Sequence, residues 1–533
     1  MKKRILKLIA LSLVVLTAFS VVGCNGCDWS MFDALFEIQP DVPSGEWNSP
    51  DDTTLVTDKR EETQYWTEQS WTFVTAPNGP LDFEGAKLVI LLPDDNDVSR
   101  EFYLDVPADE VDEAVCMRNA AVEDTLNVTV EYERVPIDRS NKDQHRAILY
   151  DIIAKDFTSE LHSYDISVNY AYATVGMAQR GYAANLLDEE TFPYFEFDLP
   201  CWNYSFMSEP GTSNGKRMYY ALGAMQISYY NSAVVTWYNK TLYEKSRDEK
   251  DPERLPKKVF EGRWTYEEMY RMVTSMYGDK EGAKPLLINE SCADIVKSAF
   301  PVSWGVKLVT NGYNQTNHFY DFNISFGNTK AEDTLKKVRA LLSAEGTVYG
   351  NEVNFANGGA LFFIDQFDAD HDRNMVIREM EDKYGLLPLP QYEERDDHFG
   401  NTYVGDGYNL MSVINYGGGE DIKGAAVSAW MQLGMEESYT SVLEYYFARV
   451  VMPKFFGSDL SPQDYMDSSL ILEYIMCSIV FDRASVYSDQ LGGINSLWCD
   501  AVDDEEGRTL EQIYKERREQ LDEALKSFND FYK

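Results

Sequence analysis

The sequence predicts an α/β fold built on parallel sheets, because expected strands and helices alternate along most of its length. Residues 85–92 form a short apolar run closed by Pro93, which is typical of a strand buried on both faces. This run is followed by a helical period over 111–126 and a β-rich strand over 128–135. A second helix is then expected around Ile148, Ile152 and Ile153, and a third strand over 164–169. Strands that alternate with helices of about ten or more residues indicate βαβ units.

The same alternation returns in the later half of the chain. Thr265 and Glu268 are spaced as a capping box, and Pro462 suits the first position of a helix. The last helix carries apolar side chains on one side, from Leu510 to Phe528, so we expect it to dock on the body of the protein. Further strands are expected at 215–220, 234–240, 355–364 and 384–390, and further helices at 331–342 and 422–433.

The N-terminus has the parts of a secretory signal peptide. A basic start, with Lys2, Lys3, Arg4 and Lys7, precedes an apolar run over 8–22 that is too short for a membrane span of about 20 residues. Residues 21–24, Val-Val-Gly-Cys, resemble the bacterial lipobox, in which the Cys carries a diacylglycerol. We therefore predict a lipid-anchored protein on the extracellular face of the cell membrane, tethered through Cys24. The alternative is an ordinary secretory signal with an incidental Cys.

Length and charge narrow the function classes. The chain has 533 residues, which suits two large lobes or three smaller ones. Its formal net charge is −41, and loss of the basic leader makes it more negative still. Such a surface repels nucleic-acid phosphates and anionic lipid headgroups and suits neutral or cationic ligands, although solubility alone is an equally good reason for it.

Metal and catalytic signals are weak. The seven Cys are scattered, and with only five His a zinc site is not expected. Residues 368–372 with Glu379 place acidic side chains at calcium-loop spacing, but Arg373 stands where a Gly is needed, so a solvated acidic loop is favoured. No nucleophile-elbow, metalloprotease or phosphate-loop motif occurs, and we predict no cofactor and no enzyme.

A binding site is expected beyond the third strand. In open α/β sheets, ligands meet the loops at the carboxyl ends of the strands. Asn169, Tyr170 and Tyr172 stand there, and two aromatic rings with an amide suit a sugar, whose CH face stacks and whose hydroxyls need hydrogen bonds. The alternative is that both tyrosines pack against the next helix.

Several segments, in this order, resemble the extracellular solute-binding proteins of bacterial ABC importers, family 1, the carbohydrate-binding cluster that includes maltose-binding protein. They are residues 164–166, 215–220, 237–240, 262–265, 355–363 and 384–390. The resemblance implies a type II two-lobed fold, in which a hinge of several crossing strands joins two mainly parallel sheets flanked by helices. On this basis we divide the chain into a signal peptide (1–23), a tether (24–80), a first lobe (81–225), a second lobe (226–400) and a return segment with helices shared between lobes (401–533).

The resemblance also implies a monomer that binds a sugar or oligosaccharide in a cleft and delivers it to a membrane permease. Candidate ligand contacts, for each of which core packing is an alternative, are Asn169, Tyr170, Tyr172, Trp202, Gln226, Trp304, Asp365, Phe367, Asp406 and Tyr408. Two other functions stay open. A secreted glycoside hydrolase would need a carboxylate pair, for which Asp365 and Asp406 are candidates. A binding protein for peptides or other small solutes is the third possibility.

Overall fold

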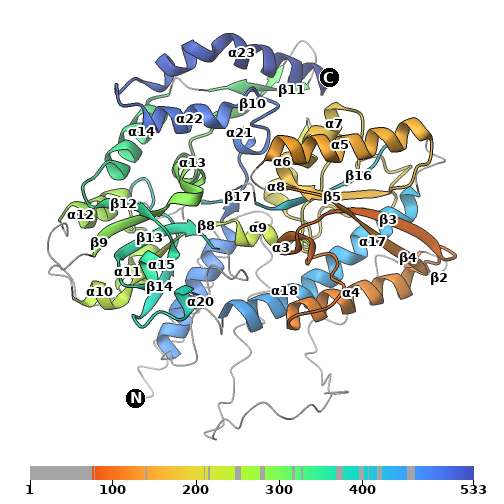
Figure 1. The fold of residues 1–533 in the computed structure, drawn as a ribbon, viewed down its shortest axis with the longest axis horizontal. Coiled ribbons are helices and arrows are strands. Elements are labelled where there is room, and N and C mark those ends of the chain that lie inside the picture. The colour runs from red at the N-terminus through yellow and green to blue at the C-terminus, as the bar shows by residue number, and fades with distance from the viewer. Residues whose placement is uncertain are drawn as a thin grey trace, which may run out of the picture.

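The structure, a computed structural model, divides into two α/β lobes, with the red-to-yellow segments in one and most of the green and cyan segments in the other (Figure 1). It describes residues 75–76, 79–138, 141–208, 211–213, 217–245, 254–275, 283–314, 319–325, 328–367, 376–394, 401–405, 407–416, 423–452 and 462–532. Within those ranges, no helix combines the length and the apolar character needed to cross a bilayer. Cys24, the acidic segment 368–372 and Asp406 lie outside the described residues.

The first lobe is built on a four-stranded sheet with the order β16-β5-β3-β4. β3 (Ala86–Pro93), β4 (Val128–Val135) and β5 (Ile166–Tyr170) run parallel, and β16 (Asn409–Val413) pairs antiparallel with β5. Each crossover helix begins at a side-chain cap. Asp109 accepts from the first-turn amides of α4 (Glu110–Leu126), and Asn141 does the same for α5 (Lys142–Ser159). The three strands and two helices expected from the sequence are confirmed.

A late part of the chain completes this lobe. α17 (Gly424–Glu437) and the irregular helix that continues it pack on α4, as the light-blue ribbon beside the orange one in Figure 1 shows. The buried Arg118 of α4 fixes the contact, because its guanidinium donates to Ser438 Oγ at 3.0 Å and to the Glu101 carbonyl at 3.1 Å. The continuation comprises η2 (Ser438–Val442), α18 (Leu443–Tyr445) and η3 (Tyr446–Val451), in which η2 and η3 are π-helical.

The second lobe holds a five-stranded sheet with the order β12-β9-β13-β8-β14. β9 (Lys284–Asn289), β12 (Thr347–Gly350) and β13 (Ala360–Gln366) are parallel, whereas β8 (Val234–Asn239) runs antiparallel to β13 and to β14 (Tyr384–Leu387). Both sheets are therefore mixed, with one antiparallel strand each among otherwise parallel ones. The helices of this lobe include α10 (Lys240–Glu244), α11 (Arg254–Phe260), α12 (Tyr266–Ser275), α13 (Ala293–Ser303), α14 (Thr329–Leu342) and α15 (Glu352–Ala356).

The C-terminal part lies mostly on the second lobe. α20 (Pro462–Cys477) packs on β14, and α22 (Ile494–Asp503) packs on α13. α23 (Leu510–Phe531) starts with a capping box between Thr509 and Gln512, and it forms the docked amphipathic helix expected from the sequence. The same region contains α21 (Arg483–Val486) and a hairpin of β10 (Val309–Asn314) and β11 (Phe319–Ile324).

Two described segments cross between the lobes. The first runs from α9 (Ser228–Asn231) into β8, and the second runs from β15 (Thr402–Tyr403) into β16. They are joined side by side, because Gly405 N donates to the Ser232 carbonyl at 2.9 Å. β17 (Ile479–Val480) pairs in parallel with β15 and adds a third strand between the lobes. Short elements of the first lobe are α3 (Asn96–Ser99), α6 (Ala171–Thr174), α7 (Gly176–Gln179), α8 (Tyr204–Ser208), β6 (Thr212–Ser213) and β7 (Arg217–Met218).

We expect Ile90→Ala to lower the free energy of unfolding by about 2–5 kcal/mol, because the truncation leaves a cavity in the central strand of the first lobe. Ile90 is fully buried (0 % exposed) and stands opposite Tyr132 of β4 and Ile166 of β5. Urea denaturation followed by circular dichroism measures the change. Val106→Ala, at a side chain that is 75 % exposed, is the control and should stay within about 0.5 kcal/mol of the parent. Equal losses in the two variants would contradict this account of the core.

Candidate functional site

The carboxyl ends of β3 and β5 bring together three of the residues predicted from the sequence. Tyr170 and Tyr172 stack with ring centroids 5.4 Å apart and planes 16° apart. Asn169, at the same strand end, reaches the ring of His145 on α5, with 3.2 Å between Asn169 Oδ1 and His145 Nε2. The Tyr170 hydroxyl donates to Asp95, just after β3, at 2.8 Å. The residues chosen because ligands bind at the ends of parallel strands therefore do lie together, in a cluster of aromatic and polar side chains.

His145 links the amide to the outer tyrosine. Its Nδ1 lies 2.9 Å from the Tyr172 hydroxyl. Burial lowers the pKa of His145, so the ring is neutral at pH 7. A neutral ring with its proton on Nε2 donates to Asn169 and accepts from Tyr172, which satisfies both nitrogens. Asn169 and His145 are fully buried and Tyr170 nearly so, whereas Tyr172 is only partly buried. The buried pair thus holds Tyr172 in position.

Sequence reasoning missed His145 and Asp95, although each had a signal. His145, Leu149 and Ile153 recur at a spacing of four on the predicted second helix, which places the histidine on the inner face. Asp95 follows the end of the first strand by two residues, so the rule applied to the third strand also pointed to it. The first turn of α5 adds two cations near Tyr172, with Lys142 Nζ at 5.2 Å and the Arg146 guanidinium carbon at 6.0 Å from its ring centroid.

The carboxyl ends of β9 and β13 form the corresponding region of the second lobe. Asn289 Nδ2 donates to Asp365 Oδ2 at 2.7 Å. The other carboxylate oxygen accepts from the Cys292 thiol at 3.2 Å and from the Gln366 amide at 2.7 Å. Asp365, a predicted ligand contact, is therefore buried with both oxygens hydrogen-bonded inside the lobe. Gln366 is only partly buried, and its Nε2 lies 3.5 Å from the Ser232 carbonyl of the first crossing segment.

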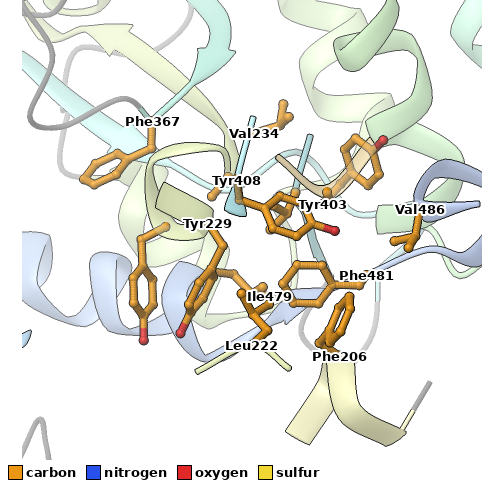
Figure 2. Close-up of a cluster of buried hydrophobic side chains, with 14 of the residues drawn as sticks. Phe206, Leu222, Tyr229, Val234, Phe367, Tyr403, Tyr408, Ile479, Phe481 and Val486 are labelled. Atoms are coloured by element: carbon orange, nitrogen blue, oxygen red, sulfur yellow. The ribbon is translucent and has the colours of Figure 1, made fainter. Parts of the chain in front are cut away.

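A cluster of apolar side chains fills the space between the crossing segments, and Figure 2 shows the rings of Tyr408, Phe481 and Phe206 grouped together. The ring centroid of Phe481 lies 5.3 Å from that of Tyr408, 5.3 Å from that of Phe206 and 6.1 Å from that of Tyr229. We call this set the hinge cluster. It comprises Phe206, Leu222, Tyr229, Val234, Phe367, Tyr403, Tyr408, Ile479, Phe481 and Val486.

Two predicted ligand contacts belong to the hinge cluster. Phe367 is fully buried and stacks on Trp237, with ring planes 8° apart and centroids 6.1 Å apart. Tyr408 is also buried, and its carbonyl accepts from Ala171 N at 2.9 Å. The structure accounts for both rings through packing on protein. Contact with a ligand stays a prediction for them, as it does for Asp406, which lies outside the described residues.

Trp202, Gln226 and Trp304 lie inside the lobes, and protein partners satisfy their polar groups. Trp202 Nε1 donates to Gln432 at 3.0 Å, and Trp304 Nε1 donates to the Pro390 carbonyl at 2.7 Å. Gln226 accepts from Gly223 N at 2.9 Å and donates to the Ala221 carbonyl at 3.1 Å. All three are nearly or fully buried. The structure does not bring them together with the tyrosine cluster, and their contact with a ligand also stays a prediction.

A cavity of about 430 Å³ opens on the second lobe between α12, α14 and the segment after β14. It is lined by Thr265, Glu267, Asp333, Lys337, Tyr392, Glu393 and Glu394. Lys337 Nζ lies 4.5 Å from the ring centroid of Tyr266 and 5.0 Å from that of Tyr392. The tyrosine cluster of the first lobe is the better candidate site, because it lies at the carboxyl ends of two parallel strands and beside a crossing segment, where Ala171 N donates to the Tyr408 carbonyl.

One buried carboxylate ties both crossing segments to the first lobe. Glu101 Oε2 accepts from Ser228 N at 2.8 Å, and its Oε1 accepts from Ser228 Oγ at 3.0 Å and from Asn409 Nδ2 at 2.8 Å. Ser228 starts α9 in the first crossing segment, and Asn409 starts β16 at the end of the second. Burial raises the pKa of Glu101 to about 7, against the hydrogen bonds, which lower it.

No family model matches the sequence, and no curated protein is significantly similar to it. Solved structures do match. The sugar-binding protein MalE from Xanthomonas citri superposes with a TM-score of 0.53 and 11 % identity, over 83 % of this chain and 98 % of that one. The chain has the two-lobed α/β fold of the periplasmic binding proteins. The resemblance seen in the sequence is thus confirmed at the level of the fold.

Two other matches are weaker. The cyclic α-maltosyl-1,6-maltose binding protein from Arthrobacter globiformis has a TM-score of 0.49 and 12 % identity, over 84 % of this chain and 99 % of that one. The galacto-N-biose/lacto-N-biose I-binding protein from Bifidobacterium longum has a TM-score of 0.48 and 11 % identity, over 83 % and 98 % of the two chains.

We expect the stability of the protein to fall as the pH rises from about 4.5 to about 7, in part because of Glu101. Its pKa is raised from 4.5 to about 7, so in this window the folded chain keeps a proton that the unfolded chain releases. Glu101→Gln removes this contribution, and its melting temperature should fall less between pH 5 and pH 7.5 than that of the parent. Scanning calorimetry at several pH values measures the difference.

The control for this prediction is Glu113→Gln, at an exposed carboxyl on α4. It should follow the pH profile of the parent. A Glu101→Gln profile parallel to that of the parent would show that this carboxyl does not titrate in the window.

Proposed function

We propose that the protein is the extracellular substrate-binding component of an ABC transporter, which captures a sugar or oligosaccharide between its lobes and delivers it to a membrane permease. One arrangement carries the proposal. The residues after β5 and after β13 both hydrogen-bond to crossing segments, Ala171 N to the Tyr408 carbonyl at 2.9 Å and Phe367 N to the Ala233 carbonyl at 2.7 Å. The carboxyl ends of both sheets therefore meet at the junction of the lobes, where ligands bind in open α/β sheets.

The chemistry of the tyrosine cluster supports a saccharide as the ligand. A partly buried tyrosine ring offers a flat apolar face to the CH groups of a pyranose, and its hydroxyl can exchange hydrogen bonds with the sugar. Tyr172 has this form, and Asn169 and His145 fix its orientation from below. Such a site binds and releases its ligand without changing a covalent bond, so the proposed protein is not an enzyme.

Capture requires movement of one lobe relative to the other. A ligand favours the closed arrangement only through its higher affinity for that arrangement, and closure about a hinge lets both lobes contact it at once. We place the hinge of this motion in the crossing segments near Ser232 and Gly405. At Gly405, an added Cβ would stand 2.9 Å from Gln366 Nε2 and 2.9 Å from Ile295 Cγ2, so any larger residue there would require these two side chains to shift.

The hydrolase alternative gains no support from the described residues. Asp365, one of its two candidate carboxylates, is buried, and both its oxygens accept hydrogen bonds from Asn289, Cys292 and Gln366. A general acid or a nucleophile needs an oxygen that faces the substrate.

The test of the proposed function is a thermal-shift screen of the purified protein with neutral mono-, di- and oligosaccharides, peptides and phosphonates. A ligand that binds only the folded chain raises its melting temperature. Stabilisation by saccharides alone, without release of reducing sugar from oligosaccharides, is the expected outcome. Stabilisation only by peptides, or turnover of a glycan, would overturn the proposal.

For a saccharide found in that screen, we expect Tyr172→Ala to weaken binding by about two- to twelvefold, because an aromatic contact contributes on the order of 0.5–1.5 kcal/mol. Titration calorimetry gives the affinity. Tyr204→Ala is the matched control, since this tyrosine is 53 % exposed on the same lobe, belongs to α8 and is not a member of the tyrosine cluster. The same affinity in both variants would remove Tyr172 from the site.

We also propose that the protein reaches its place as a lipoprotein anchored at Cys24, a residue outside those described. In cells, the wild-type chain should then sediment with membranes, and Cys24→Ala should release it into the soluble fraction or leave it unprocessed. Fractionation and immunoblotting distinguish these outcomes, with Cys27→Ala as the matched control. Membrane association of Cys24→Ala equal to that of the wild type would contradict the anchor.

A further inference from the structure

The C-terminal region forms a module that is firmly attached to the second lobe. By this module we mean the β10–β11 hairpin, α21, α22 and α23, with the loops between the three helices. Trp498 Nε1 donates to the Lys297 carbonyl of α13 at 3.0 Å, and Arg339 Nε of α14 donates to the Ala501 carbonyl at 2.7 Å. Leu510 N, at the start of α23, donates to Glu332 of α14 at 3.0 Å. The module must therefore move with the second lobe.

The far end of α23 nevertheless lies on the first lobe. The Tyr219 ring centroid is 6.1 Å from that of Phe531 and 6.0 Å from that of Tyr532, and Arg217 Nη1 lies 3.4 Å from the Phe531 carbonyl. These contacts reach the first lobe because the neighbouring Ala221 exchanges backbone hydrogen bonds with Met411 of β16, at 2.9 and 3.0 Å. Figure 1 shows α23 across the top of the molecule, from above the second lobe to a C-terminus beside the first.

A second contact lies closer to the candidate site. Asp489, in the loop between α21 and α22, forms an ion pair with Arg146 of α5. Arg146 also pairs with Asp143, and its guanidinium stands near the ring of Tyr172. The module therefore touches the first lobe at two places. In sequence, Arg217 and Phe531 are 314 residues apart, and Arg146 and Asp489 are 343 residues apart.

We propose that this C-terminal module is a latch, which holds the two lobes in the arrangement seen here and must slide or detach when they move about the hinge. The role of the latch rests on the proposed function, since a binding protein must open and close. Its physical basis is geometric. Rotation about the crossing segments displaces peripheral contacts more than contacts at the axis, so bonds made by Phe531, Tyr532 and Asp489 oppose rotation most effectively.

The latch also bears on affinity. When the competent arrangement is only a fraction of the population, the apparent dissociation constant is the intrinsic one divided by that fraction. Contacts that stabilise one arrangement therefore set the apparent affinity without touching the ligand. This chain places two such contacts, Phe531 and Tyr532, at the end of α23 and a third, Asp489, in the loop between α21 and α22.

Hydrogen exchange in the absence of ligand tests the latch directly. In the double variant Phe531→Ala/Tyr532→Ala, and separately in Asp489→Asn, amides of the crossing segments at 230–234 and 403–409 should exchange about three- to tenfold faster than in the parent, because opening becomes more frequent. Exchange in the core strands β3 of the first lobe and β13 of the second should stay unchanged, which shows that both lobes remain folded.

Tyr514→Ala is the matched control, since Tyr514 lies earlier on the same helix and donates to Asp522 of that helix. It should leave exchange in the crossing segments unchanged. The inference would be overturned if both latch variants exchanged faster only at the end of α23 and the crossing segments exchanged as in the parent. The contact would then only prevent fraying of that helix end. This result does not depend on any sugar. If saccharides fail to bind, the proposed function falls while the exchange data still decide the latch.

Discussion

The packing of aromatic rings between the crossing segments is the interaction on which the arrangement of the lobes depends. Phe481 contacts Tyr408 of one segment and Tyr229 of the other, and it also contacts Phe206 of the first lobe. Without these contacts, the two crossing segments and β17 would have to hold the lobes in register through backbone hydrogen bonds alone. Large buried rings supply that rigidity at low conformational-entropy cost, and Glu101 adds polar contacts that fix where each segment enters the first lobe.

This packing also explains which candidate residues the structure leaves within reach of a ligand. Aromatic side chains at a strand end have two possible roles at the junction of the lobes: they pack in the hinge, or they stay partly exposed. Phe367 and Tyr408 take the first role, whereas Tyr172 remains partly accessible. A linear sequence does not distinguish the roles, because the choice depends on which crossing segment passes over each strand end.

Local patterns were enough to predict much of the fold. The apolar run that became β3, the β-rich run of β4, the capping signal of α12 and the one-sided apolar pattern of α23 all act within a few residues of each other, so the sequence displays them directly. β9 was not predicted, although Leu286 to Ile288 are apolar, because Pro285 precedes them and the run is short. β16 was missed for a different reason. It is a strand because β5, about 240 residues earlier, provides its pairing partner. β8, the antiparallel strand of the second sheet, was predicted because its own residues are apolar and β-rich, so local reasoning fails where a strand depends on a distant partner, as β16 does.

The first lobe is discontinuous, and this has a consequence for how the chain folds as it is made. β16 pairs with β5 and α17 packs on α4, and both partners are synthesised long before them. Arg118 likewise hydrogen-bonds to Ser438, which lies 320 residues later in the sequence. Until about residue 450 has been synthesised, the first lobe lacks its fourth strand, β16, and one face of α4 stays exposed to solvent. Loop closure over such a span is slow. If the chain is exported as we propose, this delay keeps the first lobe incomplete until most of the polypeptide has been made, which favours passage through a translocation channel.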